Sequence, residues 1–316
     1  MRIIVILLAS VFFACNSEKS NTKLEDLEAK LEFKYKAQLG EGAFWNHRDQ
    51  NLYWVDILDN KLHIYDPQTK RNRSLFTSSM VGTVVPATDS TAVIALVDGI
   101  YIINTINGKE TRLSYVESDT KENRFNDGKC DPLGNLWVGS MHMPETSPNG
   151  NLYKVEANGT TSKMKDDITI SNGIVWTSNN KTMYYIDTPT LQIKAFDFDP
   201  ETATITNERV AVQVSREDGF PDGMAIDEND NLWVGLWNGN AVAQYDPLSG
   251  ALMRKVWVPA HNVTACAFGG ENLDILYITT ASVDMSVEEI KKFPLAGSIF
   301  KVNPGVSGVK SAFFGK

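Results

Sequence analysis

Residue types that build metal clusters and redox centres are scarce in this chain, which has three cysteines and four histidines among its 316 residues. Cys130 and Cys266 lie far apart and in no paired spacing, so we expect buried free thiols. The histidines also lack ligand spacing; they are His47, His63, His142 and His261. A metal centre built on cysteine or histidine is therefore not indicated.

Clusters of basic residues are missing too, and the formal net charge is −9. Such a surface does not favour nucleic acid or an anionic membrane, so we expect neither as a direct partner. The sequence contains no G-x-S-x-G elbow, no P-loop and no G-x-G-x-x-G, because Gly40-Glu41-Gly42 is not followed by the third glycine. Helical periodicity is nearly absent outside Ser286–Lys292, which predicts a helix of one or two turns.

The N-terminus is typical of an export signal. The apolar run Ile3–Ala14 follows Arg2, is too short to span a bilayer, and ends before Cys15 in a sequence similar to a bacterial lipoprotein cleavage box. We predict a signal peptide over 1–14, then a lipidated Cys15 and a polar tether over 15–30, which places the protein in the bacterial cell envelope. A buried first strand is the alternative, but the charge-rich residues 16–30 could not pack against it.

Residues 31–316 are long enough for one large domain, and no linker-like stretch divides them. Centres of expected strands recur at Trp54, Ile94, Trp137, Tyr185, Trp233 and Tyr277, at intervals of 40, 43, 48, 48 and 44 residues. Four-stranded propeller blades repeat roughly every 40 to 50 residues. The sequence therefore predicts an all-β fold, a six-bladed β-propeller, with tryptophan and tyrosine side chains packed between blades.

Polar residues that we place in loops just before the innermost strands are candidates for a site at the mouth of the channel. Each is followed at once or one residue later by glycine, where backbone can approach a ligand closely. These candidates are Glu41, Asn126 with Asp127, Asn172 and Asp222. Gathered at one mouth, Glu41, Asn172 and Asp222 would offer only oxygen atoms, which suits Ca²⁺, Mg²⁺ or Mn²⁺, while Zn²⁺ stays possible.

The alternative interpretation is that these are turn residues, because Asn-Gly and Asp-Gly pairs form hairpins readily. It is weakened by Glu41, which has no turn preference, and by the recurrence of the pattern in separate blades. Asp227–Asn231 is similar to the start of a calcium loop, but Leu232 stands where that loop needs glycine, so we predict a solvated hairpin turn. Trp237 precedes an Asn-Gly turn and is expected in the core or at the rim.

Four separated motifs resemble the gluconolactonase/regucalcin (senescence marker protein) family of six-bladed propellers. They are LGEGAFW, RFNDGKCDPLGNLWVGSM, SNGIVW followed by YYIDT, and PDGMAIDENDNLWVGLW. The resemblance implies a catalytic divalent metal on Glu41, Asn172 and Asp222, and contacts from Arg124 and Asn126 to a sugar-like substrate. An acidic substrate-binding residue of the family has an approximate match in Glu145.

A lactone carbonyl needs charge stabilisation as water adds, and a metal with few protein ligands leaves positions open for carbonyl and water. Asp222 could act as ligand and general base, and Arg124 could orient the substrate and stabilise negative charge. We therefore predict a monomeric, metal-dependent lactonase that acts on a sugar lactone or similar ester, with Ca²⁺ as the first choice of cation. The alternative functions are a non-catalytic sugar- or metal-binding lipoprotein and an interaction scaffold of the envelope.

Overall fold

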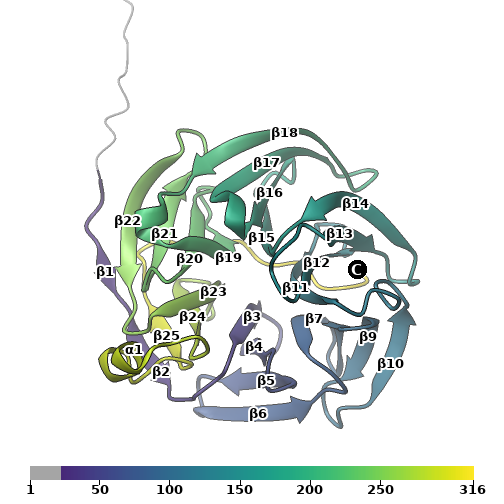
Figure 1. Cartoon of the computed structure of the whole chain (residues 1–316), viewed down its shortest axis with the longest axis horizontal. Coiled ribbons are helices and arrows are strands. Elements are labelled where there is room, and N and C mark those ends of the chain that lie inside the picture. The colour runs from purple at the N-terminus through teal and green to yellow at the C-terminus, as the bar shows by residue number, and fades with distance from the viewer. Residues whose placement is uncertain (1–22) are drawn as a thin grey trace, which may run out of the picture.

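A computed structural model describes residues 23–316, in which almost all regular structure is β-strand. Six sheets stand around a central axis like the blades of a propeller (Figure 1), and the fold predicted from the sequence is confirmed. The predicted signal peptide and the first part of the predicted tether lie outside the described residues. Within residues 23–316, no helix combines the length and the apolar character that a membrane span requires.

The first three blades follow one another along the chain, each with four antiparallel strands. The first blade contains β3 (Gly40–Asn46), β4 (Asn51–Asp56), β5 (Lys61–Asp66) and β6 (Arg71–Phe76). The second contains β7 (Val81–Thr88), β8 (Thr91–Leu96), β9 (Gly99–Asn104) and β10 (Glu110–Ser114). The third contains β11 (Asn123–Cys130), β12 (Leu136–His142), β13 (Gly150–Val155) and β14 (Thr161–Ile168). The first strand of each blade lies nearest the axis (Figure 1).

The remaining blades repeat this order, with three short helices in their connections. The fourth blade contains β15 (Ser171–Trp176), β16 (Thr182–Asp187), β17 (Gln192–Asp199) and β18 (Thr204–Gln213). The fifth contains β19 (Phe220–Ile226), β20 (Leu232–Trp237), β21 (Ala241–Asp246) and β22 (Ala251–Trp257). The sixth contains β23 (Asn262–Gly269), β24 (Ile275–Ala281) and β25 (Ile299–Val302). The helices are η1 (Thr188–Thr190), η2 (Arg216–Asp218) and α1 (Val287–Lys292), and α1 confirms the predicted short helix.

The N-terminal segment completes the ring. Strand β2 (Lys30–Phe33) pairs antiparallel with β25 and supplies the fourth strand of the sixth blade. Strand β1 (Leu27–Glu28) pairs parallel with β22, and the Asp26 carboxylate accepts hydrogen bonds from the backbone N–H of Lys255 and the indole N–H of Trp257. The tether predicted to reach residue 30 is therefore too long, because residues 24–30 lie along the edges of two blades, where charged side chains can face solvent.

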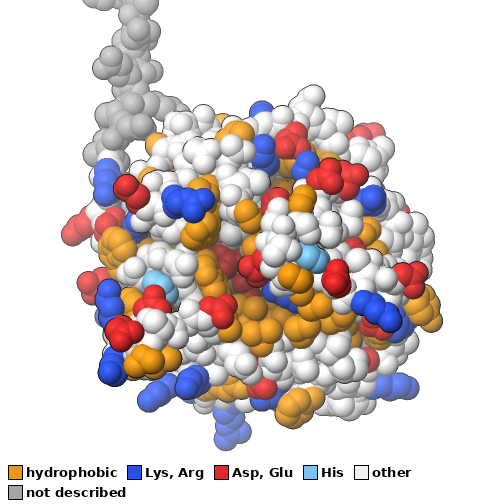
Figure 2. Space-filling view, in the orientation of Figure 1, with side chains coloured by type: hydrophobic (Ala, Val, Ile, Leu, Met, Phe, Trp, Pro, Cys, Tyr) orange, Lys and Arg blue, Asp and Glu red, His pale blue; other side chains and the backbone are white. Residues whose placement is uncertain are grey.

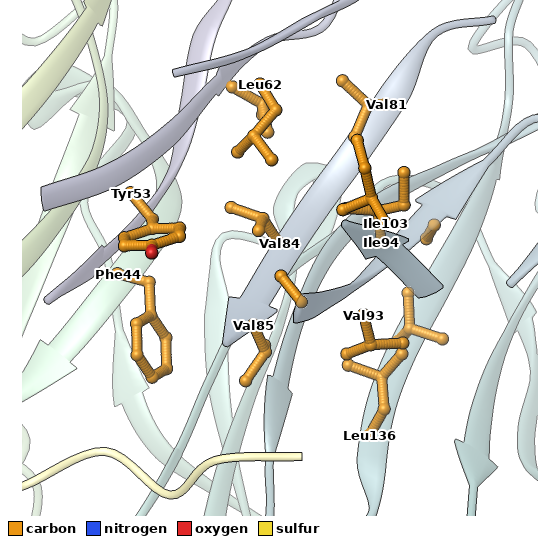
Figure 3. Packing of buried hydrophobic residues seen from close by; sticks show 14 of the residues in the cluster. Phe44, Tyr53, Leu62, Val81, Val84, Val85, Val93, Ile94, Ile103 and Leu136 are labelled. Atoms are coloured by element: carbon orange, nitrogen blue, oxygen red, sulfur yellow. The ribbon is translucent and has the colours of Figure 1, made fainter. Parts of the chain in front are cut away.

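The core lies between neighbouring blades. All six strand centres predicted from the sequence fall in the second strands of their blades, and each is at most 2% exposed. Aromatic rings join adjacent sheets: Trp45 stacks on Tyr277 at a centroid distance of 5.2 Å, and Trp233 meets the edge of Phe268 at 5.7 Å. Figure 3 shows the same principle between the first three blades, where Phe44 and Tyr53 lie beside Val84 and Val85. The predicted thiols Cys130 and Cys266 are free and buried.

Two aspartates close the turns before β12 and β20. Asp131 and Asp227 are both fully buried. The Asp227 carboxylate accepts hydrogen bonds from the backbone N–H groups of Asn229 and Asn231, the Trp233 indole and the Gln244 amide. The prediction of a turn at 227–231 is thus confirmed, whereas the expectation that it is solvated is wrong for Asp227, whose carboxylate ties the turn to the blade core.

We expect Asp227→Ala to destabilise the protein by about 3 kcal/mol or more, because it leaves several donors, two of them on buried side chains, without an acceptor. Asn229→Ala is the matched control, since Asn229 is exposed on the same turn. Chemical denaturation of both variants beside the parent measures the difference. Equal stability of the two variants would contradict this role of Asp227.

Candidate functional site

Four of the predicted site residues occupy one equivalent position in four blades. In each blade, one residue near the end of the innermost strand pairs with the first buried residue of the second strand. These pairs are Trp45 with Leu52, Cys130 with Leu136, Trp176 with Met183, and Ile226 with Leu232. Four positions earlier in each innermost strand stand Glu41, Asn126, Asn172 and Asp222. Gly82 and Thr264 fill the same position in the second and sixth blades.

These four side chains lie inside the innermost strands. The prediction that they lie in loops before those strands is wrong. At this position the pairing register shifts between Glu41 and Phe44, and again between Ser171 and Ile174 and between Pro221 and Met224. Such irregularities re-aim side chains at the end of a strand. Gly42 adopts a φ of 62°, which a bulge of this kind allows most easily for glycine.

Two of the glycines that follow the candidates are needed for packing between blades. A Cβ atom on Gly173 would lie 2.7 Å from Met224 and one on Gly223 would lie 2.6 Å from Ala265. Both contacts are with the next blade, so these glycines let the innermost strands approach each other. The residues beside them are thereby brought close together at the axis.

A chain of hydrogen bonds links the guanidinium group to the amides. Arg124 donates to the Asn126 side-chain oxygen at 2.6 Å, and the Asn126 amide donates to the Asn172 oxygen at 3.0 Å. Asn172 donates to Thr188 at 2.8 Å, and the Thr188 hydroxyl donates to the carbonyl of Pro221. The first three side chains are at most 9% exposed, so their orientations are fixed by partners rather than by water.

Glu41 and Asp222 form a buried acidic pair. Burial raises the pKa of Glu41 to about 8, with a contribution from the charge of Asp127, while the Gly42 N–H and Arg124 act in the opposite direction. Burial and the negative charges of Glu41 and Asp127 likewise raise the pKa of Asp222 well above its usual range. Two carboxylates in a desolvated site resist ionisation unless a positive charge compensates them.

The positive charge of Arg124 acts on both carboxylates of this pair. Burial lowers the pKa of its guanidinium group, and the negative charges of Glu41, Glu145 and Asp222 oppose that effect. Glu145 is itself exposed, in the connection that follows β12. Its electrostatic interaction with Arg124 places it at the same site, as the sequence analysis expected.

One cavity of about 630 Å³ brings together the residues to which the family resemblance assigned a role. Its lining includes all six predicted residues, which are Glu41, Arg124, Asn126, Glu145, Asn172 and Asp222. Figure 2 shows a hollow at the centre of this face, with acidic side chains deep inside and hydrophobic side chains around them. Trp237, predicted for the core or the rim, lies on its wall.

The donor set fits a hard divalent cation. Glu41, Asn172 and Asp222 offer two carboxylates and an amide oxygen, and both carboxylates carry raised pKa values that a nearby positive charge would lower. Among residues 23–316 there is no group of three or more His, Cys, Asp and Glu side chains with metal-binding geometry. A cation held by Glu41 and Asp222 would therefore take its third protein ligand from an amide such as Asn172.

Asp127, a candidate for the channel mouth together with Asn126, is not among the residues that line the cavity. Its buried carboxylate accepts a hydrogen bond from the Gly128 N–H at 2.7 Å, and its charge raises the pKa values of both Glu41 and Asp222. Lys129 is its electrostatic partner and donates to the carbonyl of Met224. In the sequence, the spacing of Lys129 two residues after Asp127 was the signal that could have indicated this ionic interaction.

A second cavity, of about 250 Å³, has a separate lining. Lys129 and Trp176 contribute to it, together with the C-terminal residues 309–312 and Lys316. None of the six predicted site residues lines it. Because Glu41 and Asp222 line only the larger of these two cavities, that cavity is the candidate functional site.

Fold and site together define a class of protein, a six-bladed propeller with a carboxylate, amide and guanidinium centre at one mouth of its channel. Residues 39–282 match the family described as SMP-30/Gluconolactonase/LRE-like region, and the chain belongs to this family. The family resemblance found in the sequence motifs is thereby confirmed.

Three relatives illustrate the similarity. The chain is 37% identical to "Putative sugar lactone lactonase YvrE" of Bacillus subtilis over 91% of this chain and 99% of that protein. It is 34% identical to human regucalcin, over 85% of this chain and 92% of the relative. A crystal structure of regucalcin from Agrobacterium tumefaciens, described as a calcium-binding protein, matches with a TM-score of 0.88 and 27% identity over 92% of this chain and 99% of that one.

Proposed function

We propose that this protein is a lactonase that opens a sugar lactone or a similar small ester with the help of one divalent cation. The observation that carries the proposal is the buried pair of Glu41 and Asp222, whose pKa values are raised although the positive charge of Arg124 acts to lower them. The name of the Bacillus subtilis relative supports the reaction class, and the calcium-binding description of the Agrobacterium regucalcin supports Ca²⁺ as the cation.

The cation would be held by Glu41, Asn172 and Asp222. These oxygen donors favour Ca²⁺, Mg²⁺ or Mn²⁺ over the softer transition metals, and Zn²⁺ is the less suitable alternative. A divalent cation at this position supplies a Lewis acid for the lactone carbonyl and lowers the pKa of water. Only three protein ligands are proposed, so the coordination sphere would keep room for other oxygen atoms.

The remaining steps belong to side chains of the protein. The Asp222 carboxylate accepts a proton from the attacking water as general base. Arg124 is held by Asn126 and directs its positive charge at the acidic pair, where it stabilises negative charge that develops on the substrate. Asn126 and Glu145 bind the substrate, Asn126 from the wall of the cavity and Glu145 from its rim.

A lactone panel with controlled metal content tests the proposal. The purified protein is stripped with a chelator, dialysed, and assayed by acid release while Ca²⁺, Mg²⁺, Mn²⁺ and Zn²⁺ are returned one at a time. We expect turnover to disappear on stripping and to return with Ca²⁺. Full-rate hydrolysis in excess chelator would overturn the metal dependence, and thermal stabilisation by a lactone without any turnover would support a binding protein instead.

We also propose that the chain acts as a monomer at the bacterial cell envelope, lipid-anchored through Cys15. The proposed location and anchor rest on the lipoprotein-like sequence at 1–15, which lies outside the described residues. Its direct partner is a small lactone, and nucleic acid is not expected to bind because the net charge is −9. Mass spectrometry of the N-terminal peptide from cell membranes tests the lipid on Cys15.

A further inference from the structure

The cavity that contains the acidic pair has an extensive apolar wall. Ten hydrophobic residues line it, from all six blades: Leu39, Leu58, Met80, Met141, Met143, Ile170, Pro189, Phe220, Trp237 and Val283. Several of them stand at the rim, and Leu58 is 38% and Met143 37% exposed. Figure 2 shows hydrophobic side chains gathered around the central hollow. Apolar surface at a pocket mouth marks a binding site for an apolar group.

The wall is anchored to the protein interior. Met80, Trp237 and Val283 are partly buried and pack against the large hydrophobic cluster that includes Leu39. A binding surface supported in this way is preformed. Met143 at its rim adds an unbranched side chain that can adapt to different apolar shapes.

Few polar groups are left to bind the hydroxyls of a sugar. Thr188 already donates to Pro221 and accepts from Asn172. Asn126 and Asn172 also line the cavity, and their amide groups already bond to Arg124, to each other and to Thr188. The other polar lining residues outside the acidic centre are Glu145, Asn238 and Asp284, which are exposed at the rim. A fully hydroxylated lactone would place hydroxyl groups against the apolar wall, where each loses hydrogen bonds to water without replacement.

We propose that the preferred substrate is a lactone with an apolar substituent of several carbon atoms, such as an alkyl or aryl group, which lies against this wall. The inference rests on the proposed lactonase function and narrows its substrate class. In the reaction, the hydroxyl of water bonds to the carbonyl carbon, the acyl C–O bond of the ring breaks, and the ring oxygen takes up a proton. The product is a hydroxy acid that keeps the apolar group.

Assays of the Ca²⁺-loaded protein with three six-membered lactones distinguish a preference for apolar substituents from a preference for sugar hydroxyls. The three lactones are δ-valerolactone, which has no substituent, δ-decalactone, which carries a five-carbon chain, and glucono-δ-lactone, which carries hydroxyls. Each buried methylene group contributes roughly a fourfold increase in binding. We therefore expect kcat/KM for δ-decalactone to exceed that for δ-valerolactone by at least tenfold and that for glucono-δ-lactone by more.

Substitutions in the wall provide the second measurement. Leu58→Ser and Met143→Ser remove partly exposed side chains, so thermal unfolding should be little changed. We expect each to reduce the ratio of kcat/KM for δ-decalactone to that for δ-valerolactone by about fivefold. Leu248→Ser is the matched control, because Leu248 is 87% exposed and does not line the cavity, and it should leave the ratio unchanged.

The outcomes distinguish this inference from the function on which it rests. If none of the three lactones is hydrolysed, both the lactonase proposal and the inference fail. If glucono-δ-lactone is hydrolysed as well as or better than δ-decalactone, the lactonase stands and the apolar preference is overturned. A preference for δ-decalactone that Leu58→Ser and Met143→Ser do not reduce would also overturn the role of the wall.

Discussion

Asp222→Asn is expected to reduce kcat for lactone hydrolysis by about 10³-fold, with the fold intact. The amide has the shape of the carboxylate but cannot accept the proton of the attacking water, and it removes one of two proposed anionic cation ligands. Because Asp222 is 4% exposed and shares its surroundings with Glu41, the substitution also removes a repulsive charge from the site. The stripped variant should therefore be at least as stable as the stripped parent.

Steady-state kinetics with saturating Ca²⁺ and a thermal unfolding curve in chelator measure the two effects. Asp284→Asn is the matched control, since Asp284 is an exposed carboxylate on the rim of the same cavity, and it should change kcat by less than about threefold. An Asp222→Asn enzyme with a tenth or more of the parent kcat would remove Asp222 from the role of general base.

The number of blades could be predicted because every second strand must fill the space between two sheets. Large buried side chains such as Trp54, Trp137 and Trp233 therefore recur at a regular interval along the chain. This interval can be recognised in a single sequence. The closure of the ring could not be predicted in this way. In β2, which begins at Lys30, the last residue of the predicted tether, Glu32 accepts hydrogen bonds or ion pairs from Tyr65, Lys70 and Lys301, so polar contacts bind this charged strand to its neighbours.

The residues of the candidate site could be predicted from the sequence, but their positions in the strands could not. Glu41, Asn172 and Asp222 precede the strand centres of their blades by similar intervals of 13, 13 and 11 residues, which is a sequence signal. Their placement inside bulged strands depends on pairing register, which the hairpin sequences do not reveal. The roles of Gly173 and Gly223 depend on the neighbouring blade, far away in the chain.

The apolar wall of the cavity could not be predicted from the sequence. Its residues come from the entrances of innermost strands, from the ends of second strands, and from connections between second and third strands, such as Leu58 and Met143. Single hydrophobic residues in connections carry no periodicity, so each one alone is unremarkable. Only the ring, which brings all six sets of connections to one mouth, turns them into a surface.

The stability of the metal-free protein is expected to fall as pH rises, and Ca²⁺ should cancel this fall. The pKa of Glu41 is raised from 4.5 to about 8, so between these values the folded chain holds a proton that the unfolded chain releases. The contribution to stability is fully present below the unfolded pKa and is lost as pH rises through the folded pKa. The raised pKa of Asp222 acts with the same sign.

Buried histidines change the stability with pH in the opposite direction at lower pH, and this limits the pH range in which the effect of the acidic pair can be measured. Burial lowers the pKa of His63 to about 3, so protonation of the unfolded chain reduces stability below the ordinary histidine pKa of 6.5. We therefore expect the cleanest signal between about pH 6.5 and pH 8.5. In this range the unfolding temperature of the stripped parent should fall by several degrees, and that of stripped Glu41→Gln should fall less.

Adding Ca²⁺ at about 100 times its dissociation constant should stabilise the parent by about 2.7 kcal/mol, and more strongly at pH 8.5 than at pH 6.5 if free Ca²⁺ is held constant. The reason is that a cation binds the ionised carboxylates, so the protons on Glu41 and Asp222 compete with it. Glu41→Gln lacks one of these carboxylates and should gain little from Ca²⁺ at either pH. Parallel pH profiles for parent and variant, with and without Ca²⁺, would show that the buried acidic pair is not where the cation binds.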